Sequence, residues 1–145
     1  MSSNGTSPQA PTTAGVLICD DNAAIRRLLS AIVDRNPALR VVGEAADGNE
    51  AIVKAKSHEP DVILLDLAMP NRSGLEALPE LRRLVPNAQI IVLSGFANAN
   101  VAEEVLALGA VAYVEKGAPP DEIVAAIEEA FANAPGSPAS LVTLP

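Results

Sequence analysis

Side chains that could do chemistry stand at or just past the ends of several short apolar runs, and they are Asp20, Asp21, Asp66, Ser94 and Lys116. Asp66 follows the aliphatic residues 62–65, which lie between two prolines. A run of this length is too short for an ordinary helix and predicts a buried strand. The carboxyl ends of parallel strands meet at one edge of a sheet, where open α/β folds bind their ligands. We therefore expect these side chains to share one crevice.

Three carboxylates in one crevice repel one another, so the cluster is tolerable only if protons or a cation compensate the charge. Magnesium suits this role, because Mg²⁺ takes few protein oxygens and keeps waters and a phosphate in its shell. With such an ion bound, Asp66 could act as a nucleophile toward phosphorus. Ser94 and Lys116 could then hold the remaining phosphoryl oxygens.

The elements that must position these residues follow an alternating pattern of buried runs and amphipathic segments. The expected strands are residues 16–19, 41–45, 62–65, 90–93 and 111–114. Strands that alternate with helices predict an α/β fold with a parallel sheet covered on both faces. The order expected at this size is 2-1-3-4-5, a doubly wound, flavodoxin-like sheet. Asp20 and Asp21 would then lie beside Asp66, because strands 1 and 3 are neighbours.

Several helix boundaries are marked by local signals. The tripeptide Asp20-Asp21-Asn22 supplies a turn and a cap for the first helix. Ser73 and Glu76 have the spacing of a capping box. Pro79 lies inside the helix that follows and should either kink it or tighten its first turn, because proline removes a backbone hydrogen bond. Gly109 is expected to end the fourth helix.

The composition fits one domain, since 49% of the 145 residues are hydrophobic and 19% are charged. We expect that domain at residues 15–133, with flexible tails at 1–14 and 134–145, where the chain is rich in Pro, Ser and small residues. The net charge of −8 argues against direct contact with nucleic acid. No apolar run is long enough for a membrane span, no signal peptide pattern is present, and Cys19 reads as a buried, reduced thiol. The expectation is a soluble, cytoplasmic protein.

The site residues together resemble a known family. Asp20-Asp21, Asp66 with Met69-Pro70 and Gly74 behind it, Ser94-Gly95, Tyr113 and Lys116 match the order and spacing of the receiver domain of two-component response regulators. The resemblance covers about residues 15–132. It implies a stand-alone switch that is controlled by phosphorylation and signals through protein contacts. Such a domain catalyses its own phosphorylation and dephosphorylation and acts on no other substrate.

The resemblance also implies a phosphoryl-transfer site. Asp66 would be the phosphoacceptor, which takes its phosphoryl group from a phosphohistidine of a sensor histidine kinase or phosphotransfer protein. Asp21, Asp66 and the backbone carbonyl of Ala68 would bind Mg²⁺ directly, and Asp20 would act through a water molecule. Lys116 would contact the phosphoryl group.

A switch is implied in the same way. Ser94 resembles the hydroxyl that moves toward the phosphoryl group, and Tyr113 the aromatic residue that turns inward behind it. The surface reshaped by this movement would bind a downstream protein. Beyond Arg83 the only basic residue is Lys116, so that surface should be acidic, and we expect a basic partner and a monomer rather than a dimer.

Three positions depart from the commonest pattern of the family. Gly117 stands where many receivers have proline, so a cis peptide is not expected there and Lys116 should be held less rigidly. Ala68 and Phe96 occupy positions that are often polar and that tune the lifetime of the phosphoryl group. Neither side chain can orient an attacking water, which predicts a long-lived phosphorylated form.

Other interpretations fit the same residues. Taken singly, the acids could be a helix cap, Ser94 a turn hydroxyl and Lys116 a surface charge. The chain could be a fragment of a longer transcription factor with a helix-turn-helix domain, or a binding module that has kept the fold only. A small phosphohydrolase with an aspartate nucleophile is a further alternative, but it requires a second acid where Ala68 stands.

Overall fold

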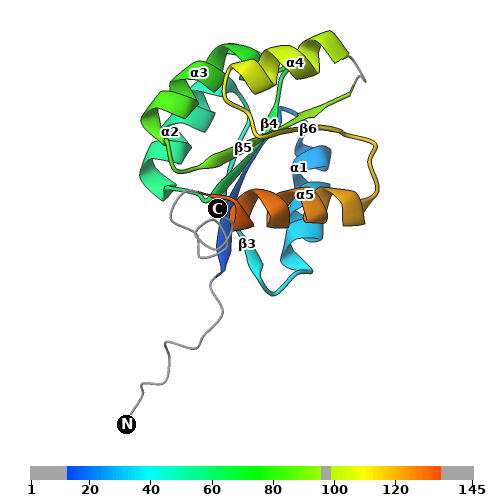
Figure 1. Cartoon of the computed structure of the whole chain (residues 1–145). Coiled ribbons are helices and arrows are strands. Elements are labelled where there is room, and N and C mark those ends of the chain that lie inside the picture. Colours follow the sequence, from blue (N-terminus) through cyan, green and yellow to red (C-terminus); the bar gives the residue numbers. More distant parts are fainter. Residues whose placement is uncertain (1–12, 96–98, 135–145) are drawn as a thin grey trace, which may run out of the picture.

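The computed structural model describes residues 13–95 and 99–134. These residues form a five-stranded parallel sheet with helices on both faces (Figure 1). The strands are β2 (Ala14–Cys19), β3 (Leu39–Ala45), β4 (Val62–Asp66), β5 (Gln89–Ser94) and β6 (Ala112–Glu115). The helices are α1 (Ala23–Asp34), α2 (Gly48–His58), α3 (Gly74–Leu84), α4 (Ala99–Ala107) and α5 (Pro120–Ala132).

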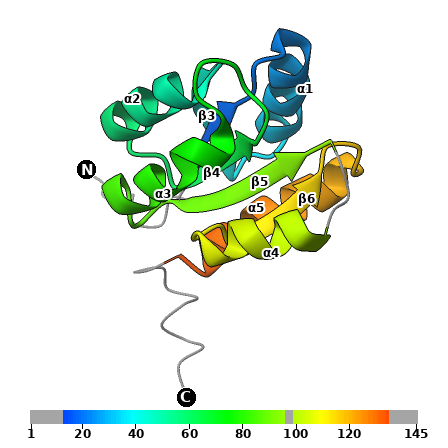
Figure 2. The same cartoon turned by 90° about the horizontal axis from the view of Figure 1, so that it is seen from above.

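The sheet has the order β3-β2-β4-β5-β6, and every neighbouring pair is parallel. Figure 2 shows the sheet from above, with β3 and β6 at its two edges. This is the order 2-1-3-4-5 along the chain, so the predicted doubly wound α/β fold is confirmed. The first and third strands, β2 and β4, lie side by side at the centre.

The sheet separates two hydrophobic cores. One core packs β-strand side chains such as Leu17 and Leu65 against α2, α3 and α4, and the other packs residues such as Ile18 and Leu64 against α1 and α5. Strands buried on both faces explain why the predicted runs are continuously aliphatic rather than alternating. Cys19 is buried in the first core as a free thiol, as predicted, and burial raises the pKa of that thiol.

The ends of the domain extend slightly into the predicted tails. Ala14 pairs with Leu39 as the first residue of β2, and its N–H donates to the carbonyl of Ala38 at 2.9 Å. Ala134 is buried after α5, and its N–H donates to the carbonyl of Phe131. Because both residues have small side chains, the sequence predicts them as part of the tails, although their backbone groups are hydrogen-bonded. Residues 1–12 and 135–145 of the predicted tails lie outside the described part of the chain.

The helix signals have clear structural counterparts. Ser73 and Glu76 form the predicted capping box, with Glu76 N–H donating to Ser73 Oγ and Ser73 N–H donating to the Glu76 carboxylate. Pro79 lies inside α3, as predicted, and the helix runs from Gly74 to Leu84. Gly109 follows α4 with φ of +114°, a left-handed conformation that glycine adopts without strain. None of the helices in the described residues is long and apolar enough to cross a membrane.

Gly74 is required by the close approach of α3 to the end of β4. Its N–H donates to the carbonyl of Leu67 at 2.9 Å, which brings the first turn of α3 against the backbone of Asp66. A Cβ atom at position 74 would lie 1.9 Å from the Asp66 carbonyl oxygen. The absence of a side chain at this position therefore allows the loop that follows Asp66 to fold tightly.

We predict that Gly74→Ala lowers the free energy of unfolding by about 2 kcal/mol or more, because the backbone of Asp66 must move to admit the methyl group. Urea denaturation measures the change. The matched control is Gly117→Ala, since a Cβ at position 117 would meet nothing within 4 Å. Equal stability of the two variants would contradict the packing argument.

Candidate functional site

The three predicted acids meet at the carboxyl edge of the two central strands. Asp20 and Asp21 follow β2, Asp66 ends β4, and Cys19 pairs with Leu65 in the register of these strands. One carboxylate oxygen from each acid lies within 4.8 Å of the others. Asp20 is 1% exposed and Asp66 is 4% exposed, whereas Asp21 is open to solvent. The predicted proximity of the acids is confirmed.

The cap of α1 is provided by Asn22 rather than by either acid before it. The side-chain oxygen of Asn22 accepts hydrogen bonds from the N–H groups of Ala24 at 2.8 Å and Ile25 at 3.2 Å. Asp20 instead accepts a hydrogen bond from the N–H of Asn22 at 2.9 Å, which fixes the orientation of its carboxylate. Neither Asp20 nor Asp21 caps the helix, so the side chains of both belong to the acidic cluster.

Lys116 bridges two of the three acids. Its Nζ atom lies 2.7 Å from Asp20 Oδ2 and 3.1 Å from Asp66 Oδ2, and its backbone N–H donates to the carbonyl of Ser94 at 2.8 Å. The contact with Asp20 is short but poorly directed, so within the described residues Asp20 Oδ2 has an ion pair and no well-aligned hydrogen bond. Burial opposes the ammonium charge, yet the two carboxylates outweigh it and raise the pKa of Lys116.

The charge of the cluster is only partly compensated. Burial raises the pKa of Asp66, and the negative charge of Asp20 raises it further, whereas Lys116 and the N–H of Ala68 at 3.3 Å act in the opposite direction. The net result is a pKa above the ordinary value of 3.8. Three carboxylates face one ammonium group here, which leaves an excess of negative charge in a largely buried site.

The donor set fits a magnesium ion. All of the available groups are hard oxygens, which Mg²⁺ prefers. Three carboxylates and one ammonium group leave two negative charges, which a divalent cation would neutralise. Asp20, Asp21 and Asp66 would hold the ion, together with the backbone carbonyl of Ala68, because Ala68 lines the same pocket. Their close spacing allows one small cation to be shared, with room for water or phosphate oxygens in the open pocket.

That pocket has a volume of about 780 Å³ and contains all of the predicted site residues that the structure describes. Its polar lining is formed by Asp20, Asp21, Asn22, Asp66, Ser73, Ser94, Tyr113 and Lys116. Ser94, the last residue of β5, is buried, and Tyr113 in β6 is half-buried. Phe96 lies outside the described residues.

Arg26 is a site residue that the sequence analysis missed. Its Nη1 donates to the carbonyl of Asp20 at 2.6 Å, and its Nε pairs with Glu44 at 3.0 Å. The guanidinium group thereby holds the backbone that carries both acids of the first strand. No motif or spacing in the sequence links Arg26 with Glu44, which lies on the neighbouring strand. The larger apolar side chains of the pocket lining were missed for the same reason, and they are Ile25, Leu67, Leu75 and Val101.

A doubly wound sheet with an acidic cluster, a hydroxyl and a lysine at its carboxyl edge has the architecture of a signalling receiver. The comparison with family models agrees, because the model of the response regulator receiver domain matches residues 16–128. The chain therefore belongs to the response regulator receiver domain family. Receiver domains are signalling domains rather than conventional enzymes.

Relatives within this family include both chemotaxis and transcription proteins. The chemotaxis protein CheY of Thermotoga maritima is 35% identical over 114 residues, which cover 79% of this chain and 94% of that protein. The transcriptional regulatory protein LiaR of Bacillus subtilis is 37% identical over 120 residues, which cover 83% of this chain and 57% of that protein. The chain spans from 53% to 64% of the length of the matched regulators YxjL, LiaR and PdtaR.

Solved structures show the same fold. A LuxR-family two-component response regulator from Aurantimonas matches with a TM-score of 0.80 and 32% identity, covering 85% of this chain and 88% of that chain. CheY in a CheX-CheY-BeF3-Mg complex from Borrelia burgdorferi is a further match, with a TM-score of 0.78, 26% identity, and coverage of 83% and 90%. Both similarities extend over nearly all of the described residues.

We predict that Asp66→Asn raises the melting temperature of the metal-free protein at pH 7. The raised pKa of Asp66 means that its charged form opposes folding, so removing the charge should raise the melting temperature. The contribution of Asp66 favours folding below its ordinary pKa of 3.8 and is lost as the pH rises through the folded value. The difference between variant and parent should therefore disappear below that pH.

Thermal melts in a chelator measure this effect. Asp61→Asn is the control, because it removes one charge at the opposite end of β4 and keeps an oxygen for the N–H of Gly15. A rise of equal size in both variants would attribute the effect to net charge rather than to the cluster.

Proposed function

We propose that this receiver domain accepts a phosphoryl group on Asp66 from a phosphohistidine of a sensor histidine kinase or phosphotransfer protein. The observation that carries the proposal is the cluster of Asp20, Asp21 and Asp66 within 4.8 Å, bridged by Lys116, at the carboxyl edge of the sheet. The family model supports it, because phosphorylation-activated signalling is the activity typical of receivers.

In the transfer, a carboxylate oxygen of Asp66 forms a bond to phosphorus while the bond from phosphorus to the histidine nitrogen breaks. The imidazole leaves with the electron pair of that bond. Magnesium, held by Asp20, Asp21, Asp66 and the Ala68 carbonyl, would neutralise charge on the phosphoryl oxygens. Lys116 would move from its partner carboxylates toward a phosphoryl oxygen, and Ser94 would donate a hydrogen bond to another. The domain acts on no other substrate in this proposal.

The same residues suggest how the phosphoryl group changes the surface. Ser94 and Tyr113 line the pocket that contains Asp66, although they come from β5 and β6. Drawing the Ser94 hydroxyl toward the phosphoryl group would open space for the ring of Tyr113 to turn inward. Phosphorylation would thus shift an existing equilibrium between two arrangements of α4, β6 and α5.

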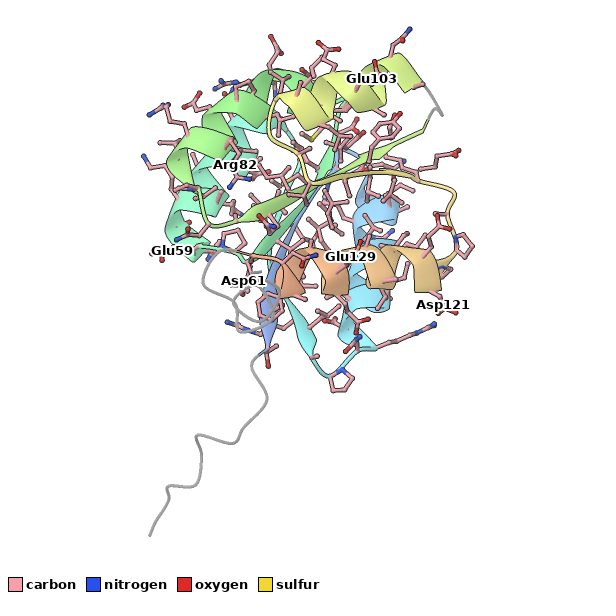
Figure 3. All side chains as sticks on the ribbon, viewed as in Figure 1. Glu59, Asp61, Arg82, Glu103, Asp121 and Glu129 are labelled. Carbon is pink, nitrogen blue, oxygen red and sulfur yellow. The ribbon has the colours of Figure 1, made fainter. Side chains whose placement is uncertain are left out.

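The surface of α4 and α5 is suited to a basic partner protein. Figure 3 shows Glu103 on α4 and Asp121 and Glu129 on α5, and all three side chains are exposed. A symmetric dimer through this surface would place like charges opposite each other, so we favour a monomer that binds a basic downstream protein. The same acidity argues against direct contact with nucleic acid.

Two settings for the domain stay open as proposals. The domain could act by itself, in the manner of the chemotaxis relatives, or as the receiver of a longer transcription factor such as the matched regulators. The phosphohydrolase alternative is not supported, since Ala68 offers a backbone carbonyl but no second carboxylate to the pocket.

The direct test is intact mass after incubation with acetyl phosphate and Mg²⁺. The parent protein should gain one phosphoryl group, whereas Asp66→Asn should gain none because it lacks the nucleophile. Chelation of the metal or Asp21→Asn should reduce the yield strongly. Modification that persists in Asp66→Asn would show that the phosphoacceptor has been assigned wrongly.

The lifetime of the phosphorylated form gives a second test. Ala68 lines the pocket with an exposed methyl group that cannot orient water, so we expect slow dephosphorylation. Ala68→Asn should shorten the lifetime several-fold, and Phe96→Glu should act in the same direction. Ala68→Val, which adds bulk without a polar group, should not shorten it. Identical rates in Ala68→Asn and the parent would contradict the argument.

A further inference from the structure

Residues 44–48 form the segment that joins β3 to α2. This segment supplies no group to the proposed chemistry, yet it is hydrogen-bonded to both of the loops that carry the site. On one side it holds the loop between β2 and α1. The N–H of Asp20 donates to the carbonyl of Ala45 at 2.9 Å, and Arg26 links Glu44 to the carbonyl of Asp20. The backbone of the first two acids is therefore anchored on this segment.

On its other side the segment holds the loop between β4 and α3, residues 67–73. The N–H of Gly48 donates to the carbonyl of Arg72 at 2.7 Å, and Asn71 Nδ2 donates to Asp47 Oδ2 at 2.9 Å. A Cβ at position 48 would lie 2.6 Å from the Arg72 oxygen, so the two backbones are in direct contact. This loop carries Ala68, whose carbonyl is a proposed magnesium ligand.

Asp47 is a rigid anchor because it also caps a helix. Its second oxygen accepts the N–H of Glu50 at 2.8 Å, which fixes the carboxylate at the start of α2. That hydrogen bond first, and then the amide of Asn71, lower the pKa of Asp47. Asn71 has φ of +63°, a left-handed conformation that asparagine tolerates better than most residues. Both the backbone and the side chain of Asn71 are thus committed to one geometry.

We propose that Asn71, through its hydrogen bond to Asp47, is a positioning residue that sets the affinity of the site for Mg²⁺. The pair holds the loop so that the Ala68 carbonyl and Asp66 are arranged before the metal arrives. Without it, the loop keeps its backbone hydrogen bonds at Leu67 and Arg72 but loses a side-chain restraint, and the additional ordering needed on binding is subtracted from the affinity. The inference rests on the magnesium site of the proposed function.

The test is the binding of Mg²⁺ to the metal-free protein, measured by titration calorimetry. Asn71→Gly removes the amide, keeps the net charge and accepts the positive φ without strain. It should bind Mg²⁺ roughly three- to tenfold more weakly, the change expected for one hydrogen bond. Binding within about twofold of the parent would overturn the proposal.

A rescue variant separates positioning from a general loosening of the loop. The double substitution Asp47→Asn with Asn71→Asp exchanges donor and acceptor, keeps the net charge, and leaves an oxygen at position 47 to cap α2. It should restore Mg²⁺ affinity to within about twofold of the parent. A double variant as weak as Asn71→Gly would overturn the role of the pair.

Binding of Mg²⁺ by the parent protein distinguishes failure of the metal site from failure of the positioning role. If the parent itself does not bind Mg²⁺, the proposed metal site is wrong, and the positioning role of Asn71 fails with it. If the parent binds and Asn71→Gly binds equally well, the metal site stands and only the positioning role fails.

Discussion

The crowding of three carboxylates at the edge of the sheet is the constraint on which the rest of the structure depends. Asp20 and Asp66 are buried by the central strands, which removes water that would otherwise screen their charges. The negative charge is partly compensated by the ammonium group of Lys116 and by backbone N–H groups that donate to the carboxylates. Neither is sufficient to balance the site, so the geometry of the strands itself creates the demand for a cation.

Much of this could be predicted from the sequence, because the information is local. Continuous aliphatic runs require burial on both faces, and their alternation with amphipathic segments leaves few possible topologies. Acids, a hydroxyl and a lysine that each follow such a run must then meet at the same edge. The order of the strands and the proximity of Asp20, Asp21 and Asp66 followed from these rules.

The interactions that could not be predicted join residues far apart in the chain without any periodicity. Arg26 pairs with Glu44, and Asn71 with Asp47, through contacts that depend on the length and direction of single side chains. The start of the first strand was also predicted too late, at residue 16, whereas β2 begins at Ala14. A small residue adds nothing to the apolar pattern even when its backbone is paired. Such contacts determine how accurately a site is held, whereas the apolar pattern determines only where it lies.

The bridge formed by Lys116 has a consequence for ion selectivity. Its ammonium group already provides one positive charge to Asp20 and Asp66, at 2.7 and 3.1 Å. A monovalent ion that took the place of this ammonium group at Asp20 and Asp66 would replace a tethered charge by an equal one and would gain no Coulomb energy there. A divalent ion offers twice the charge and can keep water or phosphate oxygens bound as well. At these two carboxylates, only an ion of higher charge would improve on the compensation that the lysine already provides.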